Sequence, residues 1–264
     1  MSASSSSNQD LTLLKAQHCR SSNQLASAQH RWEGYVMTVN ATARRTLRTV
    51  ALLESLNIST HLFRAVPARS QSEMAKVRSN LLTQRGIYEL VAKSAGSPDD
   101  YVLLFEDDVM VTPAVSRRSV PRLLACGAAL SLMWRLPLFY AGACAPRDQG
   151  NNLIDDDHGA TAHQPIASAV RVSARCAHAY AVRRGDAAAL RTLADTRPDR
   201  GPSQMPGRSR RDKAWYMDVQ LDFLAQEQGG FFLVAPRARS PQDPAMRGVF
   251  YQDRATFPSD IKPI

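Results

Sequence analysis

The sequence predicts an α/β fold with a mixed, mostly parallel central sheet flanked by helices. Between residues 35 and 105, three short apolar runs typical of strands alternate with two segments whose apolar residues recur at helical spacing. This β-α-β-α-β order is typical of parallel strands joined by right-handed crossovers. Beyond residue 118, helical and strand-like segments continue to alternate. We therefore expect one domain over residues 31–250, with polar tails over 1–30 and 251–264.

The first half of this domain supplies five expected elements. Its strands are apolar runs that end at a polar residue or a proline, and its helices present one apolar face and stop near an asparagine or a glycine. They are a strand over Tyr35–Asn40, a helix over Thr42–Leu56, a strand over His61–Val66, a helix over Glu73–Ala95 and a strand over Tyr101–Phe105.

The second half continues the alternation between two long loops, expected over residues 145–165 and 196–213. Pro121 fits the first turn of the next helix. The expected elements are a helix over Arg118–Leu130, an extended segment over Ser131–Gly142, strands over Val170–Val172 and Ala177–Val182, helices over Gly185–Asp195 and Ala214–Gln226, and a strand over Gly230–Ala235.

The composition indicates a folded protein with an anionic partner. The 264 residues are 44% hydrophobic, enough for a sizeable core, and the formal net charge of +9 favours nucleotide phosphates, nucleic acid or acidic lipid surfaces. No apolar run reaches the roughly 20 residues of a membrane span, and the polar N-terminus does not resemble a secretory signal. The four cysteines form no CxxC pair, so we expect reduced thiols. The lack of a visible leader favours a cytoplasmic location, as in a protein of bacterial or viral type.

The most informative stretch is the strand that ends in three carboxylates, Glu106, Asp107 and Asp108. Like charges at the end of a buried strand are costly unless a cation compensates them. Hard divalent cations such as Mg²⁺ take oxygen ligands, commonly one or two carboxylates plus substrate phosphates. Ligands of open α/β sheets bind at the carboxyl ends of the strands. The stretch therefore indicates a metal site for a phosphorylated ligand, and the alternative is a solvated acidic turn.

Four segments within residues 34–240 carry a family resemblance. They are Val36–Asn40 with Arg44, Arg45 and Arg48 behind it, then Phe63–Val66, Val102–Val109, and Ala177–Val182 followed by Gly185–Leu190. In this order they resemble the opening strand and Arg-rich first helix, the second strand, the signature LILEDDV and the segment THAYIISRKGAKKLL of family 25 glycosyltransferases. That family has the GT-A fold and includes lipopolysaccharide and collagen galactosyltransferases. The chain departs from it where Thr83-Gln84 replaces the usual Ser-His and Pro67-Ala68 replaces Asp-Gly.

The resemblance implies an enzyme that transfers a hexose, by default galactose, from a UDP-sugar to a hydroxyl of a glycan, glycoprotein or lipid-linked acceptor. It also implies dependence on Mn²⁺ or Mg²⁺, with Asp108 and Glu106 as ligands and Asp108 active in catalysis, because the departing diphosphate develops negative charge. On this resemblance, Glu106 is expected to hold the metal through water or to contact the ribose. Asp107 belongs to the same donor site or is a structural residue turned into the sheet edge.

Further donor contacts are expected at the strand ends. Asn40 ends the first strand, where the base and ribose should lie. Arg44 and Arg48 lie one helical turn apart and can reach phosphate, or they form a solvated helix face. His178 lines the site or is a packed strand histidine. Arg237, after the last strand, is expected to contact the diphosphate.

Two acidic groups lie farther along the chain. Asp218, which shares a helix face with Asp222, is the expected general base, and the alternative is a charge that complements the helix dipole. The run Asp155–His158 is expected to be a solvated loop rather than a second metal cluster.

Other functions remain open on the residues alone. A divalent-metal phosphoesterase or nuclease would use the same acids and hold nucleic acid on its basic surface, but the further acids of a two-metal site are not evident. A non-catalytic relative would keep the fold and bind glycan or protein. Nucleic acid is not the expected partner of the transferase.

Overall fold

The computed structural model describes residues 32–113, 115–144, 168–172, 175–196, 217–235 and 246–252. Every helix and strand expected from the sequence has a counterpart in this part of the chain, with bounds that differ by up to seven residues. The helices are α2 (Arg44–Ser55), α3 (Glu73–Lys93), α4 (Val120–Met133), α5 (Ala187–Thr196) and α7 (Met217–Glu227). The strands are β1 (Trp32–Thr38), β2 (Ile58–Arg64), β3 (Tyr101–Glu106), β4 (Val109–Val111), β5 (Leu138–Cys144), β6 (Ser168–Val172), β7 (Arg175–Arg183), β8 (Phe231–Ala235), β9 (Met246–Gly248) and β10 (Phe250–Gln252).

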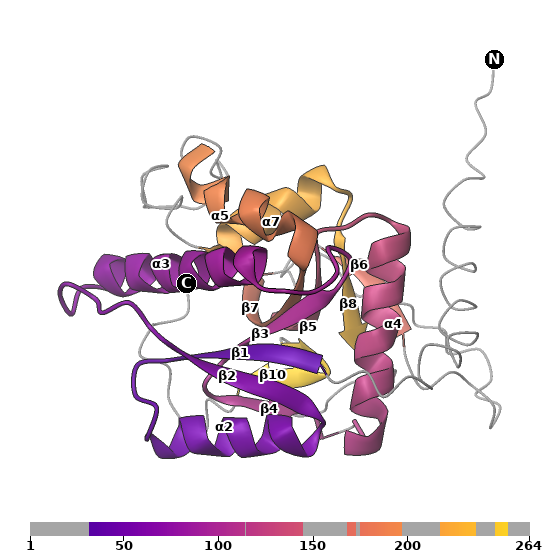
Figure 1. The fold of residues 1–264 in the computed structure, drawn as a ribbon, viewed down its shortest axis with the longest axis horizontal. Coiled ribbons are helices and arrows are strands. Elements are labelled where there is room, and N and C mark those ends of the chain that lie inside the picture. Colours follow the sequence, from indigo (N-terminus) through magenta and orange to yellow (C-terminus); the bar gives the residue numbers. More distant parts are fainter. Residues whose placement is uncertain are drawn as a thin grey trace.

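The described strands build an 8-stranded sheet in the order β2-β1-β3-β7-β5-β8-β6, with β9 paired to β5. β2, β1, β3, β5 and β8 run in one direction, whereas β7, β6 and β9 run in the other. A small second sheet pairs β10 antiparallel to β4. Helices flank the central sheet (Figure 1), so the predicted α/β class with a mixed, mostly parallel sheet is confirmed.

The winding of the chain reverses at β1. α2 leads from β1 to its parallel neighbour β2, and α3 then returns the chain across β1 to β3 on the other side. Figure 1 accordingly shows α2 and α3 on opposite faces of the sheet, with α5 and α7 on the side of α3. The carboxyl ends of β1 and β3 therefore form a topological switch point, which is where open α/β sheets bind their ligands.

The core lies on both faces of the sheet, and β3 runs through its centre. Leu103, Leu104 and Phe105 are fully buried, as expected for a strand covered by helices on both sides. α2 buries two leucines and also two threonines, Thr46 and Thr49, against the sheet. Burial of these hydroxyls calls for hydrogen-bond partners, and those partners belong to the acidic tip of β3.

The structure corrects two expected boundaries. α4 continues to Met133, where an extended segment was expected from residue 131, and Arg135, two residues after the helix, lies in the left-handed region with φ 54°. The expected domain end at residue 250 coincides with the first residue of β10, which runs to Gln252. β4, β9 and β10 were not expected, because strands of three residues carry too little alternation to stand out in a sequence.

Cys126 of α4 is buried and disulfide-bonded, so the expectation of reduced thiols is wrong for this residue. Disulfides persist mainly in oxidising compartments, and the cysteine spacing gave no signal of this bond. None of the described helices is both long enough and apolar enough to cross a lipid bilayer.

Candidate functional site

Asp107 anchors the tip of β3 to β1 and α2. Its Oδ2 accepts hydrogen bonds from Thr38 Oγ1 at 2.8 Å, Thr46 Oγ1 at 3.1 Å and Arg45 Nε at 3.2 Å. Thr49 Oγ1 donates to the backbone oxygen of Asp107 at 3.0 Å. The residue is only 8% exposed, so these donors take the place of water. Asp107 is thus turned toward the sheet and α2. This is the second of the two alternatives given for it above, a structural residue turned into the sheet edge.

Asn40 closes the turn that joins β1 to α2. Its side-chain Oδ1 accepts from the backbone nitrogen of Thr42 at 3.0 Å and from its hydroxyl at 2.9 Å. Its backbone oxygen lies 3.0 Å from Thr46 Oγ1, whose one proton is shared between this oxygen and Asp107, and its backbone nitrogen donates to Thr38 Oγ1 at 3.1 Å. The turn and the acidic tip therefore share two threonines. A contact between Asn40 and a nucleotide stays a prediction.

Glu106 and Asp108 meet on the side-chain amide of Gln252. Nε2 of Gln252 donates to Oε2 of Glu106 and lies 3.5 Å from Oδ1 of Asp108. Asp108 is 8% exposed and Gln252 6%, while Glu106 is half-buried. A side-chain amide has two N–H donors, so one glutamine can serve both carboxylates. The two acids predicted as metal ligands thus share one partner, Gln252. Asp107 between them bonds a different set of residues.

Several contacts hold β10 where Gln252 reaches these acids. The ring of Phe250 lies edge-on to Phe105 of β3, with centroids 5.2 Å apart and planes at 78°. His178 Nε2 lies 3.0 Å from the backbone oxygen of Phe250. Thr112 Oγ1 donates to the backbone oxygen of Gly248 at 2.8 Å. His178 is 1% exposed, so it is a packed strand histidine that supports the strand carrying Gln252.

The predicted phosphate-binding arginines diverge. Arg44 is exposed at the first residue of α2, whereas Nε of Arg48 contacts Sδ of Met110 at 3.1 Å on β4. Arg45 between them bonds Asp107 and was not among the predicted donor contacts. Arg237 and the run Asp155–His158 lie outside the described residues.

Asp218 lies in the first turn of α7, where its carboxylate also complements the helix dipole. Its Oδ1 accepts from the backbone nitrogen of Val219 at 3.0 Å, and the residue is half-buried. α7 packs against β7, the neighbour of β3 (Figure 1). Asp222, expected on the same helix face, is 6% exposed and belongs to the interior. The role of Asp218 as a base stays a prediction.

A buried hydroxyl network lies behind β3. The hydroxyls of Tyr88 and Tyr180 are 2.7 Å apart, and Tyr180 also donates to Oε1 of Gln84 at 2.5 Å. Gln84 in turn donates through Nε2 to Oδ1 of Asn80 at 2.5 Å. Burial raises the pKa of both tyrosines above the ordinary value. Tyr180 pairs in register with Leu104 of β3, so Gln84 supports the central strand through the Tyr180 hydroxyl.

Glu106 and Asp108 suit a divalent cation by their chemistry. Among the described residues, no group of three or more His, Cys, Asp and Glu side chains is arranged to hold a metal. Two carboxylates nevertheless match what Mg²⁺ takes from a protein when substrate phosphates and water complete its shell. The pair therefore fits a metal that is bound together with a phosphorylated ligand, rather than a closed site made of protein ligands alone.

Sequence reasoning missed Gln252, Thr38 and Thr46. Gln252 stood in a segment assigned to the tail, and a single glutamine carries no pattern. Thr46 and Thr49 did give a signal, because they fall three residues apart on the apolar face of a helix, where buried hydroxyls need partners.

A comparison with models of known protein families gives no match, and neither does a comparison with curated proteins.

Proposed function

We propose that this protein is a divalent-metal-dependent glycosyltransferase that moves a hexose from a UDP-sugar to an acceptor hydroxyl. The observation that carries the proposal is the pair of Glu106 and Asp108 joined by Gln252 at the carboxyl end of β3. This is the end where the winding reverses beside β1, the usual position of a nucleotide in an open α/β sheet. The GT-A fold is part of the same proposal and is supported by the order of the elements.

The proposed chemistry requires stabilisation of a departing diphosphate. Glu106 and Asp108 would hold Mn²⁺ or Mg²⁺, which when bound neutralises negative charge on the phosphate oxygens. Asp107 would keep the two carboxylates in place through its bonds to β1 and α2. Arg44, exposed at the start of α2, would add positive charge beside the diphosphate.

The acceptor side of the proposal involves Asp218. A carboxylate at the start of α7, over β7, would accept the proton of the acceptor hydroxyl as that oxygen bonds to the sugar. Carboxylates near the reacting carbon would also stabilise its oxocarbenium-like charge. The galactose donor, by default, and the glycan, glycoprotein or lipid-linked acceptor rest on the family resemblance.

Thermal unfolding in the presence of Mn²⁺ and a panel of UDP- and GDP-sugars tests the proposal. UDP-sugars together with Mn²⁺ should raise the Tm, because a ligand that binds the native state stabilises it by mass action. The Asp108→Asn variant should lose this shift and all donor turnover while keeping its far-ultraviolet circular dichroism. Asp99→Asn, an exposed acid at the opposite end of β3, is the matched control and should behave as the unmodified protein.

The alternatives give different results in the same assay. A shift with DNA or RNA and none with nucleotide sugars would indicate the phosphoesterase or nuclease. No shift with any nucleotide would indicate a non-catalytic binding protein. Normal donor turnover by Asp108→Asn would contradict the assignment of the metal ligands.

A further inference from the structure

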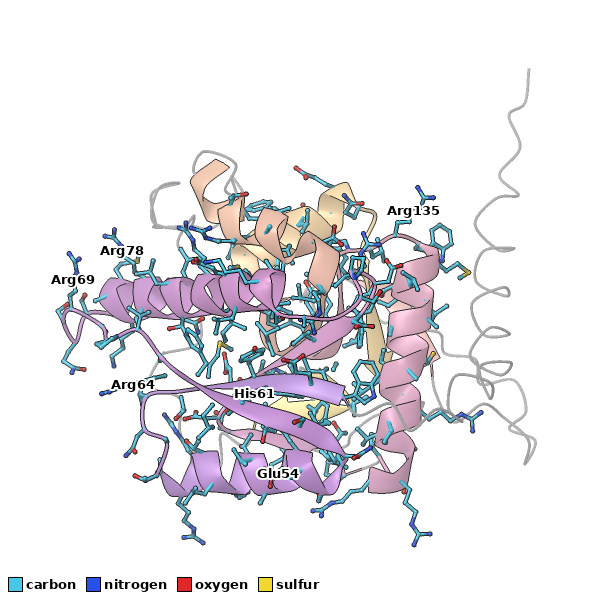
Figure 2. The ribbon with its side chains drawn as sticks, in the orientation of Figure 1. Glu54, His61, Arg64, Arg69, Arg78 and Arg135 are labelled. Carbon is cyan, nitrogen blue, oxygen red and sulfur yellow. The ribbon has the colours of Figure 1, made fainter. Side chains whose placement is uncertain are left out.

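Exposed arginines surround the carboxyl ends of β1 and β2. Arg44 begins α2, Arg64 ends β2, Arg69 lies in the following loop and Arg78 lies in the second turn of α3, and all four are exposed. We call these four residues the basic rim. Figure 2 shows Arg64, Arg69 and Arg78 at one end of the molecule and Arg135 at the other.

Backbone and side-chain hydrogen bonds fix the rim beside the candidate site. Arg64 is the register partner of Thr38, and the backbone nitrogen of Ala65 donates to the Thr38 oxygen at 2.7 Å. Thr38 is the residue whose hydroxyl bonds Asp107. The next residue, Val66, bonds through its nitrogen to Thr83 Oγ1 of α3 at 2.9 Å, which ties the loop to the helix that carries Arg78. The rim and the acidic tip therefore belong to one ordered end of the fold.

Three of the four rim arginines carry positive charge that no carboxylate of the described residues compensates. Residues 39–49 contain Arg44, Arg45 and Arg48 and no acidic residue, and residues 64–78 contain four basic residues and one acidic residue. Asp107 neutralises Arg45. Within the described residues, Arg44, Arg64 and Arg69 form no ion pair with a carboxylate. Arginines in this state favour oxyanions, phosphate above all, because the guanidinium donates in a planar fork.

Large apolar side chains are exposed among these arginines. Val39, directly after β1, is 62% exposed, and Leu47, one turn after Arg44 on α2, is 55% exposed. Nucleic-acid surfaces combine basic residues with aromatic side chains for stacking, and the exposed apolar residues here are aliphatic. Basic residues mixed with exposed aliphatic side chains are typical of proteins that lie on a membrane surface.

We propose that the basic rim docks the protein on an anionic lipid surface. The arginines would contact headgroup phosphates, while Val39 and Leu47 enter the boundary between headgroups and acyl chains. Because the rim shares its end of the sheet with Glu106 and Asp108, docking turns the candidate site toward the membrane. This inference rests on the charge and exposure of the rim and does not depend on the transferase proposal.

Sedimentation with lipid vesicles tests the inference on the full chain. The protein should bind vesicles of phosphatidylcholine mixed with phosphatidylglycerol, should not bind phosphatidylcholine alone, and should be released by salt. The variant Arg64→Gln with Arg69→Gln should partition about 25-fold more weakly, at about fivefold per arginine. Arg135→Gln, at the far end of the molecule, is the matched control and should bind normally (Figure 2). Val39→Ser should weaken binding without changing its salt dependence.

Three outcomes would overturn the inference. Equal binding to neutral and anionic vesicles would exclude recognition of charge. A loss in Arg135→Gln as large as in the rim variant would place the contact at the other end of the molecule. The third outcome is a rim variant that binds vesicles as well as the parent protein does but loses binding of a single-stranded oligonucleotide that the parent binds. That result would show that the rim is a nucleic-acid surface.

Discussion

The carboxylate of Asp107 accepts a 2.8 Å hydrogen bond from the hydroxyl of Thr38, so side chains join the tips of two neighbouring parallel strands. Asp107→Asn should reduce the free energy of unfolding by about 1–3 kcal/mol, because one oxygen that serves three donors loses its charge in a buried setting. Urea denaturation measures the change. Glu54→Gln, an exposed acid on α2, is the control and should stay within about 0.5 kcal/mol of the parent. Equal effects of the two variants would contradict a structural role for Asp107.

Replacing the shared donor of Glu106 and Asp108 should lower stability in the absence of metal. Gln252→Glu substitutes a third carboxylate for an amide, and we expect a loss of about 1–3 kcal/mol. If the two acids bind a cation, Mn²⁺ should restore more stability to Gln252→Glu than to the parent, because a third oxygen anion joins the set. Tm with and without Mn²⁺ measures both effects, and Gln226→Glu, on the exposed face of α7, is the control. A Gln252→Glu variant as stable as the parent in both conditions would argue against the shared contact.

The buried tyrosines predict a loss of stability in alkali. The pKa of Tyr88 and of Tyr180 is raised above the ordinary 10.0, chiefly by burial, so the native state keeps protons that the unfolded chain releases. Their contribution is complete below about pH 10 and falls as pH rises above it, by up to about 1.4 kcal/mol per pH unit for each tyrosine. Urea denaturation at a series of pH values should show this slope. In the double variant Tyr88→Phe with Tyr180→Phe the slope should be shallower, and an unchanged slope would assign the effect to other groups.

Gly142 and Gly86 form a matched pair for testing how tightly β10 packs against its neighbours. A Cβ on Gly142 would lie 2.5 Å from the backbone oxygen of Phe250 and 2.6 Å from Nε2 of His178, whereas on Gly86 it would meet the end of the Phe63 ring at 2.8 Å. A ring on an edge strand can move, but a backbone oxygen in a paired strand cannot do so without cost. Gly142→Ala should therefore destabilise the protein by about 1–3 kcal/mol, and by more than Gly86→Ala, in urea denaturation. The reverse order would mean that β10 is loosely held.

The sequence predicted the α/β class and the position of the acids because those features depend on local pattern. An apolar run such as Tyr101–Phe105 followed by three carboxylates can be recognised within one short window. The antiparallel place of β7 between β3 and β5 was not predictable in this way, because strand direction depends on connections through long loops. The sequence also could not show that Asp107 has a different set of partners from Glu106 and Asp108. Neighbouring residues at a strand end point to different sides, and only the packing of α2 and β10 shows what each one meets.

The contact between Gln252 and Glu106 spans 146 residues of sequence, and the one with Asp108 spans 144. The entropic cost of closing a loop rises with loop length, although slowly. During synthesis, β3 leaves the ribosome long before its amide partner is made. A chain that stops before β10 would therefore lack the donor that Glu106 and Asp108 share, however much of the upstream sheet it contains.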